Sequence, residues 1–185
     1  MAYCSSFKIT NAARYLKAGK VIAYPTEAVF GLGCDPLNEE AVMTLLDIKQ
    51  RPIEKGLILI AASIEQLTPY LVVDQAIIQR ISPTWPGPTT WIIPAQSWVP
   101  KWLTGSHSSL AVRVTNHPIA HGLCEKFGGP IVSTSANTTT QPAIKKSGKL
   151  IRTFAGADIF IVHGSVGGLG QETAIYDAIN GKRLR

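Results

Sequence analysis

The sequence contains few cysteines and no long apolar segment. Its 185 residues include three cysteines, Cys4, Cys34 and Cys124. This odd number and wide spacing suggest neither a disulfide framework nor a Cys-x-x-Cys metal knuckle. No stretch reaches the roughly 18 apolar residues of a bilayer-spanning helix, and the N-terminus lacks the pattern of a secretory signal. We therefore expect a cytoplasmic protein with reduced thiols and no membrane association.

Several common functional motifs are also missing. The chain contains neither the G-x-G-x-x-G dinucleotide fingerprint nor the G-x-x-x-x-G-K-[ST] phosphate loop. It lacks G-x-S-x-G, so a hydrolase triad is unsupported. His117 and His121 stand four residues apart in an expected helix, but no third ligand is in evident reach. A metal site at these histidines is therefore poorly supported.

Acidic residues are outnumbered by basic ones. The 18 Lys and Arg residues exceed the 12 Asp and Glu residues, which gives a net charge of +6. Such an excess favours acidic partners, such as nucleic acid or polyphosphates, although it can also serve solubility alone. The apolar fraction of 45% indicates a globular chain, and the length fits a single domain over residues 1–185.

Strand and helix patterns alternate along the chain. Capping residues and apolar periodicity predict helices over residues 10–18, 38–49 and 117–127, between 142 and 154, and in two short segments after Ser63 and Asp74. Apolar runs predict strands over residues 21–24, 57–62, 89–93, 110–114, 131–132 and 159–162. Asn180-Gly181 predicts a hairpin between residues 173–176 and 182–184. This order indicates an α/β domain with a mixed sheet and flanking helices.

Two polar clusters stand at the ends of expected strands. Lys49, Arg51 and Lys55 come just before the strand at residues 57–62, and the run 133–137, Ser-Thr-Ser-Ala-Asn, follows the strand at 131–132. In open α/β sheets, ligands gather beyond strand ends. Arg offers phosphate a planar fork, and Lys a point charge. Cations can also simply decorate a helix C-terminus, but the two clusters together predict a nucleotide site.

Three other features have structural interpretations. Residues 26–33 fit a strand-to-helix turn with flexible glycines. Residues 164–170 are glycine-rich and fit a mobile surface loop. The four tryptophans could stack on bases, but their neighbours favour core packing; they are Trp85, Trp91, Trp98 and Trp102.

Five motifs in order carry a resemblance to a known family. They are Tyr24-Pro-Thr-Glu-Ala-Val-Phe-Gly31, Lys49-x-Arg51-Pro52, Trp85-Pro-Gly-Pro-x-Thr90, Ala111-Val-Arg-Val114 and Ser133-x-Ser135-Ala136-Asn137. From Val21 to Arg185 the chain resembles the YrdC/TsaC family of threonylcarbamoyl-AMP synthases, in their short bacterial form. The resemblance implies a twisted mixed sheet with a positively charged concave face.

The resemblance also implies an activity and its partners. Members are nucleotidyltransferases that convert L-threonine, bicarbonate or CO2, and ATP into threonylcarbamoyl-AMP and pyrophosphate, with Mg²⁺ accompanying ATP. Downstream proteins then transfer the threonylcarbamoyl group to tRNA. Some members are also reported to bind RNA directly, so tRNA is a further expected partner.

Site residues follow by matching the motifs. Lys49 and Arg51 would be catalytic, by neutralising phosphate charge. The residues implied to bind nucleotide are Lys49, Arg51, Lys55, Ser109, Ser135, Asn137 and Arg185. The residues implied to bind threonine are Thr26, Arg113, Ser133 and Thr173. Asn137 is the possible protein contact to Mg²⁺, and no general base is evident. The chain departs from the usual family pattern at Ala28, Thr138–Gln141 and Gln171–Thr173.

Two other functions stay open at this point. The basic charge also suits a non-catalytic module that binds double-stranded RNA or tRNA, although no known RNA-reading motif appears. A related fold could instead handle carbamoyl adenylate. Arg113 favours an amino acid over a carbamoyl group, because its guanidinium suits a carboxylate.

Overall fold

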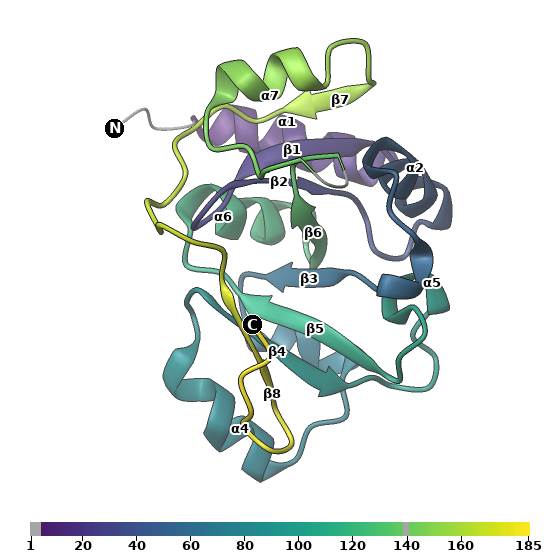
Figure 1. The fold of residues 1–185 in the computed structure, drawn as a ribbon, viewed down its shortest axis with the longest axis vertical. Coiled ribbons are helices and arrows are strands. Elements are labelled where there is room, and N and C mark those ends of the chain that lie inside the picture. Colours follow the sequence, from purple (N-terminus) through teal and green to yellow (C-terminus); the bar gives the residue numbers. More distant parts are fainter. Residues whose placement is uncertain (1–4, 139–140) are drawn as a thin grey trace.

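A computed structural model describes residues 5–138 and 141–185 of the chain (Figure 1). One mixed sheet of eight strands runs through the molecule, in the order β7-β1-β2-β6-β3-β5-β4-β8. The strands are β1 (Val21–Pro25), β2 (Phe30–Gly33), β3 (Ile58–Ala61), β4 (Thr89–Pro94), β5 (Ser109–Val114), β6 (Ile131–Ser135), β7 (Ile159–Ile161) and β8 (Ala174–Asp177). The pairs β1–β7, β3–β5 and β4–β8 are parallel, and the other neighbours are antiparallel. The predicted mixed α/β sheet is confirmed.

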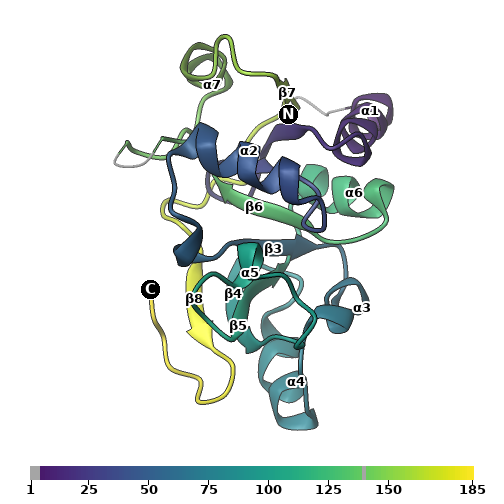
Figure 2. The same ribbon diagram turned by 90° about the vertical axis from the view of Figure 1, so that its right-hand side faces the viewer.

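Helices cover both faces of the sheet. They are α1 (Ser6–Lys17), α2 (Glu39–Lys49), α3 (Ile64–Leu67), α4 (Gln75–Ile81), α5 (Lys101–Thr104), α6 (Pro118–Phe127) and α7 (Ser147–Thr153), with 3-10 turns η1 (Ile53–Lys55), η2 (Thr68–Tyr70) and η3 (Ser82–Thr84). Figure 2 shows α1 and α6 side by side, and Figure 1 shows α6 and α2 on opposite sides of β6. In the part of the chain that the structure describes, no helix is long and apolar enough to cross a membrane.

The core consists of two apolar clusters, one on each face of the sheet. Successive side chains of a strand point to opposite faces, so Leu59 of β3 joins the cluster under α2 and Ile60 joins the one under α1 and α6. Asn38 caps α2 as predicted, because its side chain accepts a hydrogen bond from the Ala41 N–H. This cap fixes where the helix begins, and therefore the path of the chain to Lys49 at its last turn.

Helix α1 begins earlier than the sequence predicts. Thr10 was the predicted cap, but Ser5 precedes the first turn and Thr10 lies inside the helix. The Thr10 hydroxyl donates a hydrogen bond to the Ser6 carbonyl oxygen at 3.0 Å. A threonine that bonds back to the preceding turn is compatible with a helix interior, so the cap prediction is wrong.

Strand β2 replaces the turn predicted after β1. It pairs with β1 and β6, and glycine is required for the close packing there. A Cβ atom on Gly33 would lie 2.4 Å from the Val132 carbonyl oxygen and 2.8 Å from the Tyr24 ring. Glycine is unfavourable in strands generally, so the glycine-containing sequence of β2 did not predict a strand.

The remaining differences lie near the edge of the sheet. The chain reverses near Asn180 as predicted, and main-chain hydrogen bonds join the two arms, from the Asp177 N–H to the Lys182 carbonyl oxygen at 2.9 Å and from the Leu184 N–H to the Ile175 carbonyl oxygen at 2.8 Å. The return arm is not a regular strand, because its β-bridge between Tyr176 and Arg183 is an isolated one. The Asp177 carboxylate instead organises a wider turn, accepting hydrogen bonds from the N–H groups of Ile179 and Asn180. Trp98 is 51% exposed, so the prediction of core packing is wrong for this tryptophan. Trp91 is buried, and Trp85 and Trp102 pack against the core as predicted.

Candidate active site

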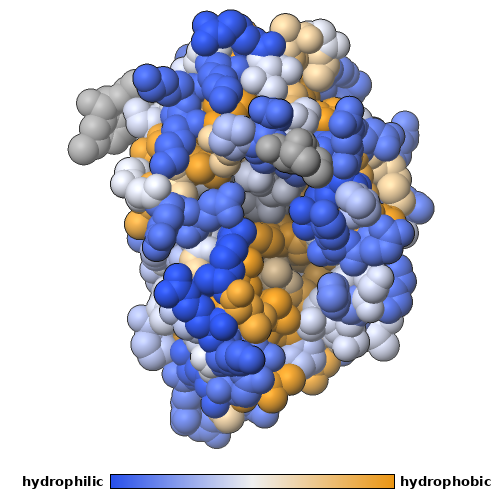
Figure 3. All heavy atoms as spheres, viewed as in Figure 1, coloured by the Kyte–Doolittle hydropathy of each residue, from blue (hydrophilic) through white to orange (hydrophobic). Residues whose placement is uncertain are grey.

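A cavity of about 330 Å³ opens on the concave face of the sheet. Figure 3 shows a hollow near the middle of this face, with apolar residues inside and hydrophilic residues around it. Its apolar lining comes from β3, β5 and β4, and polar groups gather at its two ends. The predicted site residues that line it are Thr26, Arg51, Lys55, Ser109, Arg113, Ser133, Ser135, Thr173 and Arg185.

The basic end of the cavity lies around η1. Arg51 donates a hydrogen bond from Nη2 to the Gly56 carbonyl oxygen at 2.9 Å, which fixes the guanidinium beside Lys55. Its Nε is buried without a hydrogen-bond partner among the described residues. Burial lowers the pKa of Arg51, and an anionic ligand would offset that cost. His107, which the sequence analysis missed, lines the same end.

Lys49 joins the two predicted polar clusters. Its side chain is buried, and the ammonium donates hydrogen bonds to the Ser135 carbonyl oxygen, to the Asn137 carbonyl oxygen at 2.8 Å and to Asn137 Oδ1 at 3.2 Å. Burial, followed by the charge of Arg51, lowers the pKa of Lys49 to about 8. The two clusters therefore lie close together in space. Lys49 stabilises the turn after β6 through these hydrogen bonds, but it does not line the cavity.

The turn after β6 offers little to a metal ion. Asn137 Oδ1 accepts hydrogen bonds from the Ser135 hydroxyl at 2.6 Å and from Lys49, so both of its lone pairs are used. Among the described residues, no group of three or more His, Cys, Asp or Glu could hold a metal ion. This donor set does not fit a protein-held Mg²⁺. The predicted loop Thr138–Gln141 includes residues 139–140, which lie outside the described part.

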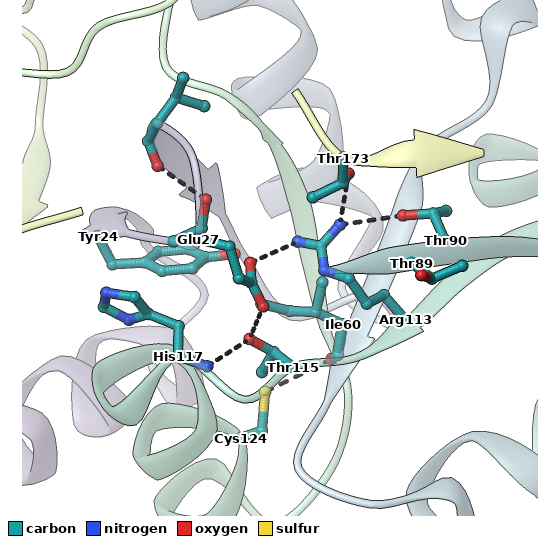
Figure 4. Close-up of polar contacts among 12 residues, drawn as sticks. Tyr24, Glu27, Ile60, Thr89, Thr90, Arg113, Thr115, His117, Cys124 and Thr173 are labelled. Atoms are coloured by element: carbon teal, nitrogen blue, oxygen red, sulfur yellow. Dashed lines mark hydrogen bonds and ion pairs between the residues drawn. The ribbon is translucent and has the colours of Figure 1, made fainter. Parts of the chain in front are cut away.

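Arg113 dominates the other end of the cavity (Figure 4). It lies on β5, and its side chain is almost fully buried. Nη1 donates hydrogen bonds to the hydroxyls of Thr90 at 3.0 Å and Thr173 at 3.2 Å. Nη2 lies 3.4 Å from Glu27 Oε2 in an ion pair. Thr26 and Ser133 line the cavity nearby, so the residues predicted to bind threonine share one end.

A group of buried polar residues behind Arg113 was not predicted from the sequence. Glu27 accepts a hydrogen bond from the Thr115 hydroxyl, and Thr115 in turn accepts one from the His117 main-chain N–H at 3.2 Å. Burial lowers the pKa of His117, and its Nε2 lies 3.0 Å from the Ser165 carbonyl oxygen, to which it donates. The available signal was Glu27 itself, a carboxylate between a buried strand and a glycine run.

The glycine-rich loop packs against this group of residues. The Gly167 N–H donates to the Thr26 carbonyl oxygen at 2.9 Å, and the Leu169 N–H donates to the Glu27 carbonyl oxygen at 3.1 Å. Residues 164–170 were predicted to form a mobile surface loop. The loop is indeed largely exposed, but these bonds attach it to the end of the cavity that contains Arg113.

Arg185, the last residue of the sequence, lines the basic end of the cavity. Its Nη1 donates to the Glu172 carboxylate at 2.6 Å, and its Nη2 donates to the Thr173 carbonyl oxygen at 3.1 Å. Because Thr173 also contacts Arg113, this terminal segment bridges both ends of the cavity. A guanidinium and a carboxylate on one segment can each exchange partners when a charged ligand enters.

The profile of the Sua5/YciO/YrdC family, described as "Telomere recombination", matches residues 14–185. The chain belongs to this family. It is 48% identical to the threonylcarbamoyl-AMP synthase of Methylococcus capsulatus, over all of both chains. It is 51% identical to that of Klebsiella pneumoniae, over 96% of this chain and 94% of the relative.

A solved member of the family shares the fold. The crystal structure of P. abyssi Sua5 complexed with L-threonine matches 97% of this chain, with a TM-score of 0.89 and 32% sequence identity. The present chain spans about half of that protein, since the match covers 53% of it. The predicted family and its twisted sheet are thus confirmed. The roles of the individual site residues remain predictions.

Proposed function

We propose that the protein is a threonylcarbamoyl-AMP synthase, and that it acts as a nucleotidyltransferase on L-threonine, CO2 or bicarbonate, and ATP. The names of full-length relatives support this proposal. The observation that carries it is one cavity with a buried guanidinium, Arg113, at one end and the exposed cations Lys55 and Arg185 at the other. Such a cavity suits an amino acid at one end and a triphosphate at the other.

The proposed reaction has two bond-forming steps. The threonine amine attacks CO2 and loses a proton, which gives a carbamate. A carbamate oxygen then attacks the α-phosphorus of ATP, and the bond from that phosphorus to the bridging oxygen breaks as pyrophosphate leaves. Two anions must meet in the second step, so neutralising their charge is the main task of the protein.

The chain's own residues divide this task between the two ends of the cavity. Arg51, Lys55 and Arg185 would hold the phosphates, while Lys49 keeps the turn of Ser135 and Asn137 in place. Arg113 would pair with the α-carboxylate of threonine. Mg²⁺ is proposed to enter only as part of the ATP complex, because the described residues contain no group of three or more His, Cys, Asp or Glu that could hold it, and Asn137 Oδ1 already accepts a hydrogen bond from Ser135.

Mass spectrometry of the product tests the proposal. The protein is incubated with ATP, Mg²⁺ and bicarbonate, and with either L-threonine or carbamoyl phosphate. We expect threonylcarbamoyl-AMP and pyrophosphate with threonine, and no adenylate with carbamoyl phosphate. RNA binding with no adenylate at all would instead favour the non-catalytic RNA-binding module.

A variant at the basic end tests the phosphate side. Arg51→Ala removes a fixed guanidinium from the cavity, and we expect it to cost about 3 kcal/mol of transition-state stabilisation, roughly a hundredfold in kcat/KM for ATP. Arg152→Ala removes an exposed cation of α7 outside the cavity and should leave this rate unchanged. Equal rates in both variants would exclude Arg51 from the mechanism.

The cellular setting follows from the proposed product. Threonylcarbamoyl-AMP is a reactive mixed anhydride, so downstream proteins that modify tRNA would consume it in the cytoplasm. The net charge of +6 is compatible with tRNA nearby, since phosphate contacts dominate non-specific affinity.

A further inference from the structure

The carboxylate of Glu27 faces the guanidinium of Arg113 (Figure 4). Arg113 lines the cavity, whereas Glu27 does not. Both side chains are 5% exposed, and Glu27 Oε2 lies 3.4 Å from Arg113 Nη2. A carboxylate in this place cannot touch a ligand in the cavity directly. It can act on the ligand through the guanidinium.

The guanidinium of Arg113 needs an anchor of this kind. Its other observed partners are the hydroxyls of Thr90 and Thr173 on Nη1, and its Nε has no hydrogen-bond partner among the described residues. These hydroxyls are neutral and can rotate, so they fix the orientation of the guanidinium plane only weakly. The Glu27 carboxylate lies 3.4 Å from Nη2 and attracts it by charge, although Oε2 makes no hydrogen bond among the described residues. This attraction is the ionic contact that holds the guanidinium on its Nη2 side.

Glu27 is itself held from three sides. The Thr115 hydroxyl donates to Oε1, and the Leu169 N–H donates to the Glu27 carbonyl oxygen at 3.1 Å. Gly167 packs so closely that a Cβ atom there would lie 2.9 Å from this carbonyl oxygen. The carboxylate therefore has a fixed position relative to both the sheet and the glycine-rich loop.

We propose that Glu27 is a positioning residue for the amino-acid substrate, which aims the Arg113 fork at the α-carboxylate. The proposal rests on the function proposed for the cavity. Bidentate recognition of a carboxylate depends on the orientation of the guanidinium plane, and small misplacements of a binding group are costly. Glu27 thus contributes to threonine affinity without touching threonine.

Glu27→Gln tests the proposal, because glutamine keeps the size and an acceptor for Thr115 but removes the charge. We expect the Kd and KM for L-threonine to rise by about tenfold or more, with the Kd for ATP changed by less than about twofold. If Glu27 only neutralises a buried charge, the melting temperature falls but threonine binds as well as before or more tightly, because the unpaired Arg113 attracts its carboxylate. That result would overturn the proposal.

Two further variants keep the test decisive. Thr115→Val removes the hydroxyl bonded to Glu27, and Thr115 does not line the cavity. We expect about fivefold weaker threonine affinity, which corresponds to the roughly 1 kcal/mol of a net hydrogen bond. This variant decides the matter if Glu27→Gln does not fold, and unchanged affinity would count against the proposal. Glu125→Gln, at an exposed carboxylate of α6, is the matched control and should bind threonine normally.

The wild-type protein separates this inference from the proposed function. Calorimetry with L-threonine alone shows whether the cavity takes the amino acid. If the wild type neither binds threonine nor forms the adenylate, the proposed function fails. If it does both, and Glu27→Gln and Thr115→Val match it, only the positioning proposal fails.

Discussion

Lys49 illustrates how burial can set the working pH of a site. Its ammonium has three N–H groups and three observed acceptors, on Ser135 and Asn137. A neutral amine offers two donors, so the turn loses one of these three hydrogen bonds when Lys49 deprotonates. Because burial, with a smaller contribution from Arg51, lowers the pKa to about 8, this loss occurs well below the usual lysine range.

We therefore predict that the KM for ATP rises as the pH increases through about 8. The free energy of unfolding should also rise over this range, because the folded-state pKa lies below the ordinary value of 10.5. The cost of burying the ammonium is fully present below about pH 8 and is relieved between about 8 and 10.5, where the unfolded chain binds more protons. Steady-state kinetics across this range, alongside urea unfolding, separate the two effects.

Lys49→Met provides the control for this pH dependence. The variant should show a high KM for ATP that stays flat across the same range. An inflection near pH 8 that persists in the variant would assign the effect to another group.

At the scale of the elements, close packing of β2 is the feature with the sharpest consequence. Gly33→Ala would place a methyl group 2.4 Å from the Val132 carbonyl oxygen of β6, a backbone atom that cannot rotate away. We expect a loss of at least about 2 kcal/mol in the free energy of unfolding, as for other overpacked sites. Denaturant unfolding measures it directly.

Gly148→Ala is the matched substitution for that experiment. Gly148 lies in α7, and a Cβ atom there would meet nothing within 4 Å. Helix propensity then favours alanine by up to about 1 kcal/mol, so this variant should be as stable as the wild type or more so. A similar loss in both variants would mean that the close packing of β2 does not cause the loss, and an unchanged Gly33→Ala variant would mean that β2 tolerates the methyl group.

The same strand shows where sequence patterns succeed and fail. Apolar runs such as Leu57–Ala62 predict strands correctly because their side chains pack on both faces of the sheet. The sequence of β2 is Phe-Gly-Leu-Gly, which lacks the apolar run typical of a strand. Its glycines are explained by the close approach of β6, and a local sequence pattern does not show which strand packs there. The Glu27–Arg113 ion pair was not predicted for a related reason. Each residue belongs to a recognised motif, but the two motifs are far apart in the sequence, and only the fold brings Glu27 next to Arg113.

At the scale of the whole molecule, the sheet brings distant segments to one cavity. The loop after β1 supplies Thr26, η1 supplies Lys55, β5 supplies Arg113, and the last residues supply Thr173 and Arg185. The sequence predicted the convergence of two polar clusters, because each follows or precedes a strand end. Local patterns alone did not place the terminal segment there, because its position depends on β8 pairing with β4 at the sheet edge. Only the family resemblance predicted Thr173 on the threonine side and Arg185 on the nucleotide side.

The cations at the two ends of the cavity differ in their exposure to solvent, and the two proposed substrates differ in net charge. Lys55 and Arg185 are exposed at the nucleotide end, whereas Arg113 is buried and already paired with Glu27. ATP is a polyanion, and threonine is a zwitterion without net charge. The net charge of +6 therefore attracts ATP from a distance and leaves threonine almost unaffected.

We predict that the two KM values respond differently to salt. Between about 0.05 M and about 0.5 M KCl, where the screening length falls severalfold, the KM for ATP should rise several-fold. The KM for threonine should change by less than about twofold, because its binding depends on the buried Arg113, which salt screens little. Parallel slopes for both substrates would mean that threonine, too, is captured by the exposed cations, and that the buried end of the cavity does not set its affinity.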